Sequence, residues 1–205
     1  MKVRSINQSV VDIVGFLYEV DSTGDVQRGF GFRLGTSNSG DNVGAHLYIV
    51  TMFGWVIGKM EGFSKKDINT IIKRCLLHDL NETRISDLDR MRQQYLDRRE
   101  DEASQDQFAQ LPFGEEMLIE VKEYRKGKKV NPIDILVKDA DLLASIVAVR
   151  KLAVAGNQEA QRWLEGRAMY NQLKTESTKK LADEIYRQRP FAWQDKVLPA
   201  ESRSR

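Results

Sequence analysis

The chain has 205 residues, of which 41% are hydrophobic and 30% are charged, and its 32 Lys and Arg nearly balance its 30 Asp and Glu. This length suits one folded domain, because single hydrophobic cores stop growing at about 250 residues. A net charge of +2 without a long basic run argues against binding to duplex DNA. The longest nearly apolar run, Leu47–Gly58, covers 12 residues, whereas a membrane-spanning helix needs about 20, so no membrane span is predicted.

The N-terminal segment and the single cysteine bear on the cellular setting. Met1–Ser5 leads into an amphipathic stretch rather than into the continuous apolar run and small-residue cleavage site of a secretory signal. Cys75 is the only cysteine, so no disulfide can form within the chain. We therefore expect a reducing, cytoplasmic location.

The first half of the chain predicts three helices and one long loop. Apolar residues recur at spacings of three and four in Ile6–Val20, which predicts an amphipathic helix with its apolar side in the core. Asp21–Asp41 holds five glycines and is typical of a long loop close to a functional site. Asn42–Lys59 is largely apolar and predicts a buried helix. Ser64 can then cap a helix over Lys65–Leu80.

The second half predicts a polar connection followed by further helices. Residues 88–110 are very polar, and we expect the segment 97–111 to be solvated and mobile. Helices are predicted over Glu115–Arg125, from Asn131 to about Ala155, and once or twice within Gln158–Arg189. No stretch alternates with period two for long enough to build a sheet. The predicted fold class is therefore all-α, a single-domain helical bundle over residues 1–205 with its core at about 6–193.

The candidate chemistry lies at the only two histidines. His46 falls within a buried-looking helix, and His78 is followed directly by Asp79 at the end of an apolar run. A further carboxylate, Asp141, enters an apolar helix downstream. Two imidazoles and two carboxylates form a mixed nitrogen and oxygen set that suits a first-row transition ion better than Mg²⁺ or Ca²⁺. Residue types alone leave the alternative open, since a helical histidine is more often a satisfied core or surface residue than a ligand.

The order of these residues resembles a known family. His46, then the run Cys75–Leu88 with its His78-Asp79 pair, then Lys138-Asp139-Ala140-Asp141, is similar to the HD-domain metal phosphohydrolases, and most similar to the 5'-deoxynucleotidase group. Glu82 and Asp87 match that group's HDxxE(x)4D extension. The resemblance covers roughly Ile13 to Trp193.

The resemblance implies a fold, a cofactor and an activity. It implies an HD-type helical bundle that binds one divalent transition-metal ion (Mn, Co, Ni, Fe or Zn) and, as a homodimer, takes a small nucleotide as substrate. The implied reaction releases phosphate from (deoxy)ribonucleoside 5'-monophosphates by attack of a metal-activated water. Glu82 and Asp87 are the implied catalytic residues, which orient the water or protonate the leaving oxygen. The implied ligands are His46, His78, Asp79 and Asp141.

Asp139 is the alternative to Asp141 as a ligand. Residues two apart point about 200° apart around a helix, so only one of the two carboxylates can face the site. The family pattern favours Asp141, which leaves Asp139 facing solvent. The neighbouring Lys138 either extends to solvent, which we favour, or neutralises phosphate.

The chain departs from the 5'-deoxynucleotidase group before the first histidine. Members often carry there an Arg that grips phosphate and a Trp that disfavours a ribose 2'-hydroxyl, where this chain has Ser22 and Asp25. Arg28 or Arg33 is the alternative source of the phosphate-binding cation. If Asp25 replaces that Trp, the enzyme should show relaxed or ribo-leaning selectivity.

Other readings remain open for several residues and for the function. Ser86-Asp87 can simply start a helix. The three tryptophans Trp55, Trp163 and Trp193 are expected in the core, and Cys75 is expected to be an inert buried thiol. The alternative functions are an HD-type hydrolase of nucleoside triphosphates or other phosphoesters, and a non-catalytic nucleotide-binding HD protein.

Overall fold

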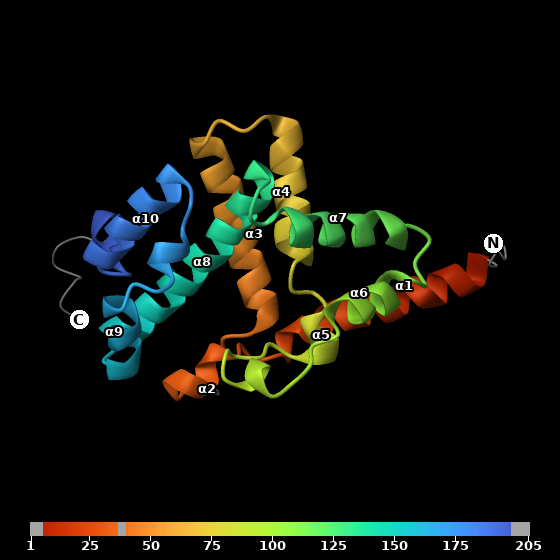
Figure 1. Cartoon of the computed structure of the whole chain (residues 1–205), viewed down its shortest axis with the longest axis horizontal. Coiled ribbons are helices and arrows are strands. Elements are labelled where there is room, and N and C mark those ends of the chain that lie inside the picture. Colours follow the sequence, from red (N-terminus) through yellow and green to blue (C-terminus); the bar gives the residue numbers. More distant parts are fainter. Residues whose placement is uncertain (1–5, 37–39, 198–205) are drawn as a thin grey trace.

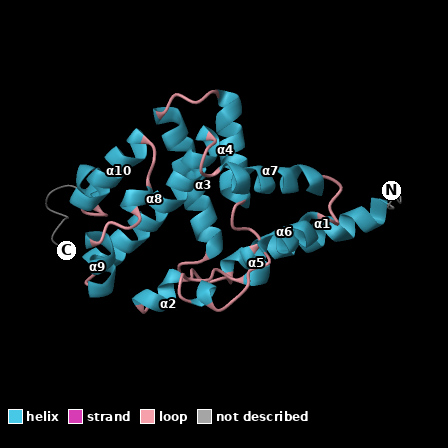
Figure 2. Ribbon diagram, viewed as in Figure 1, coloured by secondary structure: helices cyan, strands magenta, loops and turns pink. Residues whose placement is uncertain are grey.

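Helices joined by loops and turns make up the described part of the chain, a computed structural model of residues 6–36 and 40–197 (Figures 1 and 2). No strand occurs within these ranges, where one isolated bridge joins Gln27 and Asn42. The predicted all-α class is confirmed. The α-helices are α1 Ile6–Asp21, α2 Phe30–Leu34, α3 Val43–Met60, α4 Lys65–Leu77, α5 Glu82–Ile85, α6 Glu100–Phe108, α7 Gly114–Gly127, α8 Pro132–Val154, α9 Gln158–Glu165 and α10 Glu176–Arg187.

The core lies where α3, α4 and α8 pack against one another, with α7, α9 and α10 around them (Figure 1). Fully buried side chains from all three central helices meet there, including Val50, Ile71 and Leu136. A second apolar cluster joins the start of α3 to α6 and α7, with Phe108 at its centre. Burying such side chains stabilises the fold by about 1.5–3 kcal/mol each.

Helix starts follow local capping chemistry. The side chain of each residue that precedes α3, α4, α8, α9 and α10 accepts a hydrogen bond from a backbone N–H of the first turn, which would otherwise lack a partner. These capping residues are Asn42, Ser64, Asn131, Asn157 and Thr175.

Two predicted loops contain helices. The Gly-rich loop Asp21–Asp41 includes α2, and its residues 37–39 lie outside the described residues. The segment 97–111, predicted to be solvated and mobile, contains α6, which packs against α7 and buries Phe108. Arg125 on α7 donates hydrogen bonds to Asp101 and Ser104 of α6, so contacts distant in sequence order this polar helix.

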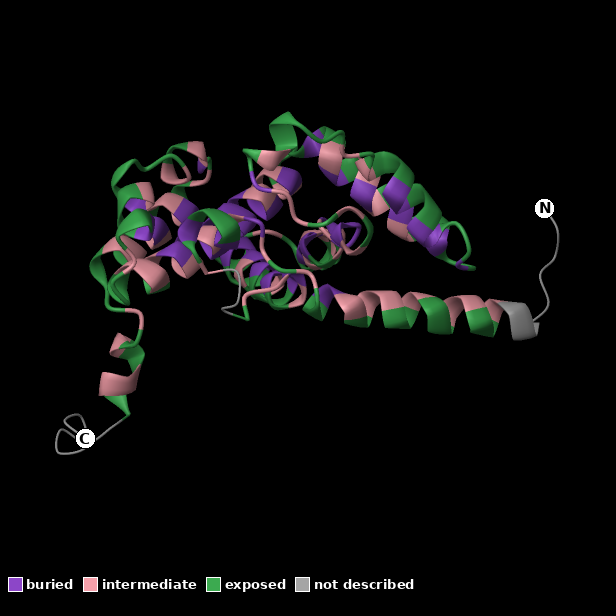
Figure 3. Cartoon of the chain, turned by 90° about the horizontal axis from the view of Figure 1, so that it is seen from below, coloured by how far each residue is buried: buried purple, intermediate pink, exposed green. Residues whose placement is uncertain are grey.

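The predicted core side of α1 is also wrong. Ile13, Phe16 and Val20 pack against the second cluster, whereas Val10 and Leu17 are more than half exposed. The helix extends away from the bundle toward the N-terminus (Figure 3). Met1–Ser5, on which the expectation about a secretory signal rests, lie outside the described residues.

The three tryptophans differ in their exposure to solvent. Trp55 and Trp193 are 46% and 62% exposed, so the expectation that they are core residues is wrong. Trp163 is partly buried against the main core. Trp55 lies on the exposed side of α3, which is therefore apolar.

Helix α3 is long and apolar enough to cross a membrane by length and composition alone, and it is the one such helix in the described residues. The sequence-based expectation rested on a shorter run within it. A core helix passes the same test, and α3 packs against α4, α8 and α10. Its central position explains the apolar residues on its packed side, whereas Tyr48, Met52 and Trp55 remain exposed.

Gly127 at the end of α7 should tolerate no side chain. A Cβ atom there would lie 1.8 Å from Oδ2 of the buried Asp134, which pairs with Arg74. We expect Gly127→Ala to lower the free energy of unfolding by about 1–3 kcal/mol through overpacking. Urea denaturation measures this change in the free energy of unfolding.

Gly15 in α1 provides the matched control, because a Cβ atom there meets nothing within 4 Å. Gly15→Ala should stabilise the protein slightly, by at most about 0.5–1 kcal/mol, since glycine is unfavourable inside a helix. Equal effects of the two substitutions would contradict the steric explanation.

Candidate metal centre and cavity

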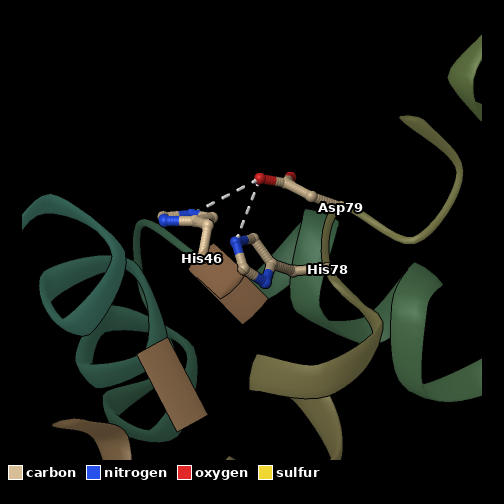
Figure 4. Close-up of side chains that lie close together, drawn as sticks. All are labelled: His46, His78 and Asp79. Atoms are coloured by element: carbon tan, nitrogen blue, oxygen red, sulfur yellow. Dashed lines mark ion pairs between the residues drawn. The ribbon is translucent and has the colours of Figure 1, made fainter. Parts of the chain in front are cut away.

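Two imidazoles and one carboxylate converge between α3 and the end of α4 (Figure 4). His46 lies in the first turn of α3, and His78 and Asp79 directly follow α4. The Asp79 Oδ2 atom lies 3.2 Å from His78 Nε2 and 3.9 Å from His46 Nε2. Both histidines are buried and Asp79 is half-buried.

Asp141 on α8 adjoins His46, next to the three residues whose ligand atoms all lie within 4.8 Å of one another. Its Oδ1 atom lies 3.1 Å from His46 Nε2, and the residue is buried. All four sequence-predicted ligands are therefore brought together from α3, α4 and α8, although they span nearly a hundred residues of chain.

Asp139 faces the other way. The expectation that it faces solvent is wrong. It is 1% exposed, and its carboxylate accepts hydrogen bonds from the backbone N–H groups of Lys174 and Thr175 and from the Thr178 hydroxyl. Asp139 thus anchors the start of α10 to α8, while Asp141 serves the cluster.

The orientation of His78 is fixed by its second ring nitrogen. Nδ1 lies 2.8 Å from the backbone oxygen of Cys75. A carbonyl oxygen only accepts, so Nδ1 carries the hydrogen, and in the neutral ring the lone pair of Nε2 is free to bind a cation. Cys75 itself is fully buried, and burial raises the pKa of its thiol, as expected for an inert residue.

The residues present fit a divalent transition ion. The Nε2 atoms of His46 and His78 are buried and make no hydrogen bond within the described residues. Two ligand atoms about 2.1 Å from one ion stand about 3.0–3.4 Å apart at bond angles of about 90–109°. The observed separations of 3.1 and 3.2 Å fall in that interval, and the third, 3.9 Å, fits a wider angle.

Neighbouring charges keep both carboxylates ionised. Burial would raise the pKa of Asp141, but Lys138 and His46 outweigh it and hold that pKa well below its usual range. Burial likewise opposes ionisation of Asp79, whose pKa is lowered by His78. The ammonium group of Lys138 donates to Asp141 Oδ2 at 2.6 Å.

A cavity of about 470 Å³ opens beside Asp79 and Asp141. It extends along α8 past Ser145 to Val149, which is about 12 Å from Asp141 at 1.5 Å per residue. Trp163 of α9 and Met169 of the turn after α9 also line its wall.

The two predicted catalytic carboxyl groups line this cavity. Glu82 is 6% exposed, and burial together with the charges of Asp79 and Asp87 raises its pKa to about 10. Asp87 lies 3.1 Å from an Arg28 guanidinium nitrogen, which is also 3.7 Å from Asp79. Asp87 does not cap a helix, so that alternative is not supported.

The Gly-rich loop delivers Arg28 to the site, and Gly29 makes this possible. A Cβ atom on Gly29 would lie 2.5 Å from the Asp87 backbone oxygen and 2.7 Å from the Asp89 backbone nitrogen. The loop can therefore approach the 87–89 segment closely only with glycine at this position. The expectation that this loop lies near the site agrees with the position of Arg28.

The four predicted substrate-binding residues separate into two pairs. Arg28 and Arg33 line the cavity. Ser22 and Asp25 are not among its lining residues; the Ser22 hydroxyl donates to the Tyr18 backbone oxygen, and Asp25 is exposed. The prediction of ribo-leaning selectivity loses its structural basis, because Asp25 does not line the cavity.

Sequence reasoning assigned Lys138 and Trp163 to other surroundings than this cavity. Lys138 was expected to extend to solvent, yet it contacts Asp141 and lines the wall. Trp163 was expected in the core, yet it lines the cavity with the Arg33 guanidinium 4.4 Å from its ring centre. The spacing of three between Lys138 and Asp141 on one helix could have signalled the first contact. No local pattern marks the second.

Comparison with protein-family models gives one match, described as an HD domain, over residues 26–189. The chain belongs to the HD domain family. HD domains bind divalent metals, which agrees with the His-His-Asp cluster, and the family indicates a metal-dependent phosphohydrolase. A search of curated proteins found no match.

Solved structures share the fold. A conserved hypothetical protein from Pyrococcus furiosus superposes with a TM-score of 0.69, and a protein from Pyrococcus horikoshii OT3 with 0.68. They are 21% and 20% identical in sequence, and the alignments cover 85% of this chain and 99% and 98% of theirs. At this identity the likeness extends to the HD fold alone.

Asp141 and Asp139 form a matched pair for testing the metal centre. We expect the purified protein to hold about one transition ion per subunit and Asp141→Asn to lose most of it, because removing one ligand charge weakens a mixed site. Asp139→Asn should retain the ion but lower the melting temperature. Elemental analysis and thermal unfolding measure the two effects; undiminished metal in Asp141→Asn would contradict the assignment.

Proposed function

We propose that this HD domain hydrolyses nucleoside 5'-monophosphates, releasing phosphate. The observation that carries the proposal is the composition of the cavity beside the candidate metal centre. Cationic and acidic side chains line it near Asp79 and Asp141, while Trp163 and Met169 give an aromatic and apolar surface beside Arg162 on the wall formed by α9 and the turn after it. A phosphomonoester of an aromatic nucleoside has the same two chemical parts.

Arg28 and Lys138 are suited to bind the phosphate. Both line the cavity and contact the cluster carboxylates, Arg28 at Asp79 and Lys138 at Asp141. Their charges attract the phosphate dianion to the place where Asp79 and Asp141 alone would repel it. Arg28 is 9% exposed, so its geometry is held by the fold.

Trp163 and Phe30 are suited to contact the base. The Arg33 guanidinium lies 4.4 Å from the ring centre of Trp163, and the Arg28 guanidinium lies 5.6 Å from the ring centre of Phe30. Stacking of a base on an aromatic ring is worth about 1–3 kcal/mol and tolerates different bases.

Glu82 and Asp87 are suited to move and hold protons at the reaction centre. When bound, a divalent ion polarises a phosphate oxygen and acidifies a water molecule. Glu82, whose pKa is raised to about 10, carries a proton at neutral pH that it can give to the leaving ribose oxygen. Asp87 holds the Arg28 guanidinium beside that proton donor and can orient a water.

Nucleoside triphosphates are the second candidate substrates. Arg33, Arg90, Arg98 and Arg162 add cations to the cavity wall beyond Arg28 and Lys138. More cations than one phosphate requires would suit a longer phosphate chain. A direct assay must therefore distinguish nucleoside monophosphates from triphosphates as substrates.

A phosphate-release screen tests the proposal. Purified protein is assayed with Mn²⁺, Co²⁺ or Zn²⁺ against ribo- and deoxynucleoside mono- and triphosphates, with Asp141→Asn as the inactive control. We expect release of inorganic phosphate from monophosphates. Activity confined to triphosphates, with pyrophosphate or triphosphate as product, would favour the second candidate.

Glu82→Gln removes the proton and preserves the shape of the side chain. We expect it to lower kcat by about 10²–10⁴-fold, as for loss of a general acid, while the bound metal is retained. The control is Glu123→Gln, an exposed carboxylate outside the cavity, which should leave kcat unchanged. Full turnover in metal-loaded Glu82→Gln would assign Glu82 a structural role.

Trp163→Ala tests the base contact. We expect kcat/KM for adenosine 5'-monophosphate to fall about tenfold or more, since loss of stacking removes about 1.4 kcal/mol or more. Ribose 5-phosphate lacks the base, so its kcat/KM should not change. Equal losses for both substrates would indicate a general disturbance of the cavity.

We also propose that the protein forms a homodimer through the exposed side of α3. Tyr48, Met52 and Trp55 lie there at helical spacing and are 38–66% exposed, which is unusual for large apolar side chains gathered on one helix. We expect light scattering to give the dimer mass and Trp55→Glu to give the monomer. Tyr95→Glu, at an exposed aromatic residue away from α3, is the control. A monomeric native protein would refute the proposal.

A further inference from the structure

A second cavity of about 490 Å³ lies among α8, α9 and α10. Arg150 of α8, Arg167 of the turn after α9, and Asp183, Tyr186 and Arg187 of α10 line it. It shares no lining residue with the catalytic cavity. Along α8, Ser145 and Val149 face the catalytic cavity, whereas Arg150 faces this one.

Two buried polar groups in this cavity lack a partner. Arg150 Nε and Tyr186 Oη are inaccessible to solvent and make no hydrogen bond within the described residues. Arg150 also forms no ion pair within the same ranges, although carboxylates are plentiful on the surrounding helices. Buried donors almost always find an acceptor in native proteins, and where the protein supplies none the acceptor is ordered water or a bound ligand.

The acidic groups around the cavity are already engaged. Asp183 accepts hydrogen bonds from Arg167 at 3.1 Å and from the Tyr170 hydroxyl at 3.2 Å. Glu165 accepts one from the Gln161 side chain at 2.9 Å. Glu184 is paired with Arg187 at 2.8 Å. None of these carboxylates reaches Arg150, whose charge is left uncompensated on the wall.

We propose that this cavity binds the phosphate group of a small molecule through Arg150 and Tyr186. A phosphate offers several strong acceptor oxygens, and arginine binds such groups with paired, charge-assisted hydrogen bonds. Tyr186 Oη supplies a neutral donor from α10, whereas Arg167 and Arg187 are paired with Asp183 and Glu184, which leaves Arg150 as the lining cation without an ion pair in the described part of the chain. The ligand thereby bridges α8 and α10.

Localised titration with inorganic phosphate tests the proposal. Backbone amide NMR shifts of zinc-loaded full-length protein are followed as phosphate is added. We expect two separate groups of shifting amides, one around Arg28 and Asp79 and the other around Arg150 and the 183–187 segment. Acetate, a carboxylate probe, should shift the second group only at about tenfold or higher concentration.

Three variants identify the donors. Arg150→Met should raise the phosphate concentration at half-saturation of the second group by about tenfold or more and leave the first group unchanged. Tyr186→Phe removes only the hydroxyl and should weaken the second group severalfold. Lys180→Met makes the same charge change on an exposed part of α10 that lines neither cavity, and should alter neither group.

The outcomes decide between a built site and general attraction to positive charge. A second group that is absent, that persists in Arg150→Met, or that Lys180→Met weakens equally would overturn the proposal. Because the measurement is binding and not turnover, it stands apart from the success or failure of the proposed hydrolase activity.

Discussion

The compensation of charge between α3, α4 and α8 is the constraint on which the rest of the structure depends. Asp141 and Asp79 bring two negative charges to the meeting point of these helices, where unpaired charge would be costly. The imidazoles of His46 and His78 and the ammonium group of Lys138 surround them. His46, His78 and Lys138 come from α3, from the end of α4 and from α8. The arrangement of these helices that packs their apolar sides is therefore also the one that places these three side chains around the carboxylates.

This balance extends outward through the loop before α3. Arg28 pairs with Asp87 and Asp79, and its backbone N–H donates to the Asp41 backbone oxygen. The bridge between Gln27 and Asn42 and the close approach at Gly29 hold the loop on both sides of Arg28. Arg28 thereby becomes part of the cavity wall, and Gly29 is the glycine that close backbone contact requires, whereas Gly35 and Gly40 adopt positive φ angles.

How much the sequence could predict depended on how local the determinants are. Helix starts at Ser64 and Asn131 were predictable because a cap needs only its own first turn. The ligand set followed from motif order, and the structure brings those four residues together. The burial of α6 was not predictable, since its polar sequence is ordered by Arg125, distant in sequence. Periodicity likewise identified α1 as a helix but could not say which of its two apolar stripes meets the core.

Asp139 and Asp141 stand two residues apart on α8 and serve opposite sides of it. One carboxylate fastens the first turn of α10, and the other contributes to the cluster with His46. A ligand that binds the native state stabilises every element that must unfold together with its site. Since α8 is the rigid connection between both carboxylates, occupancy of the centre should slow hydrogen exchange at the start of α10. Cooperativity between the C-terminal helix and the reaction centre would thus pass through a single turn of α8.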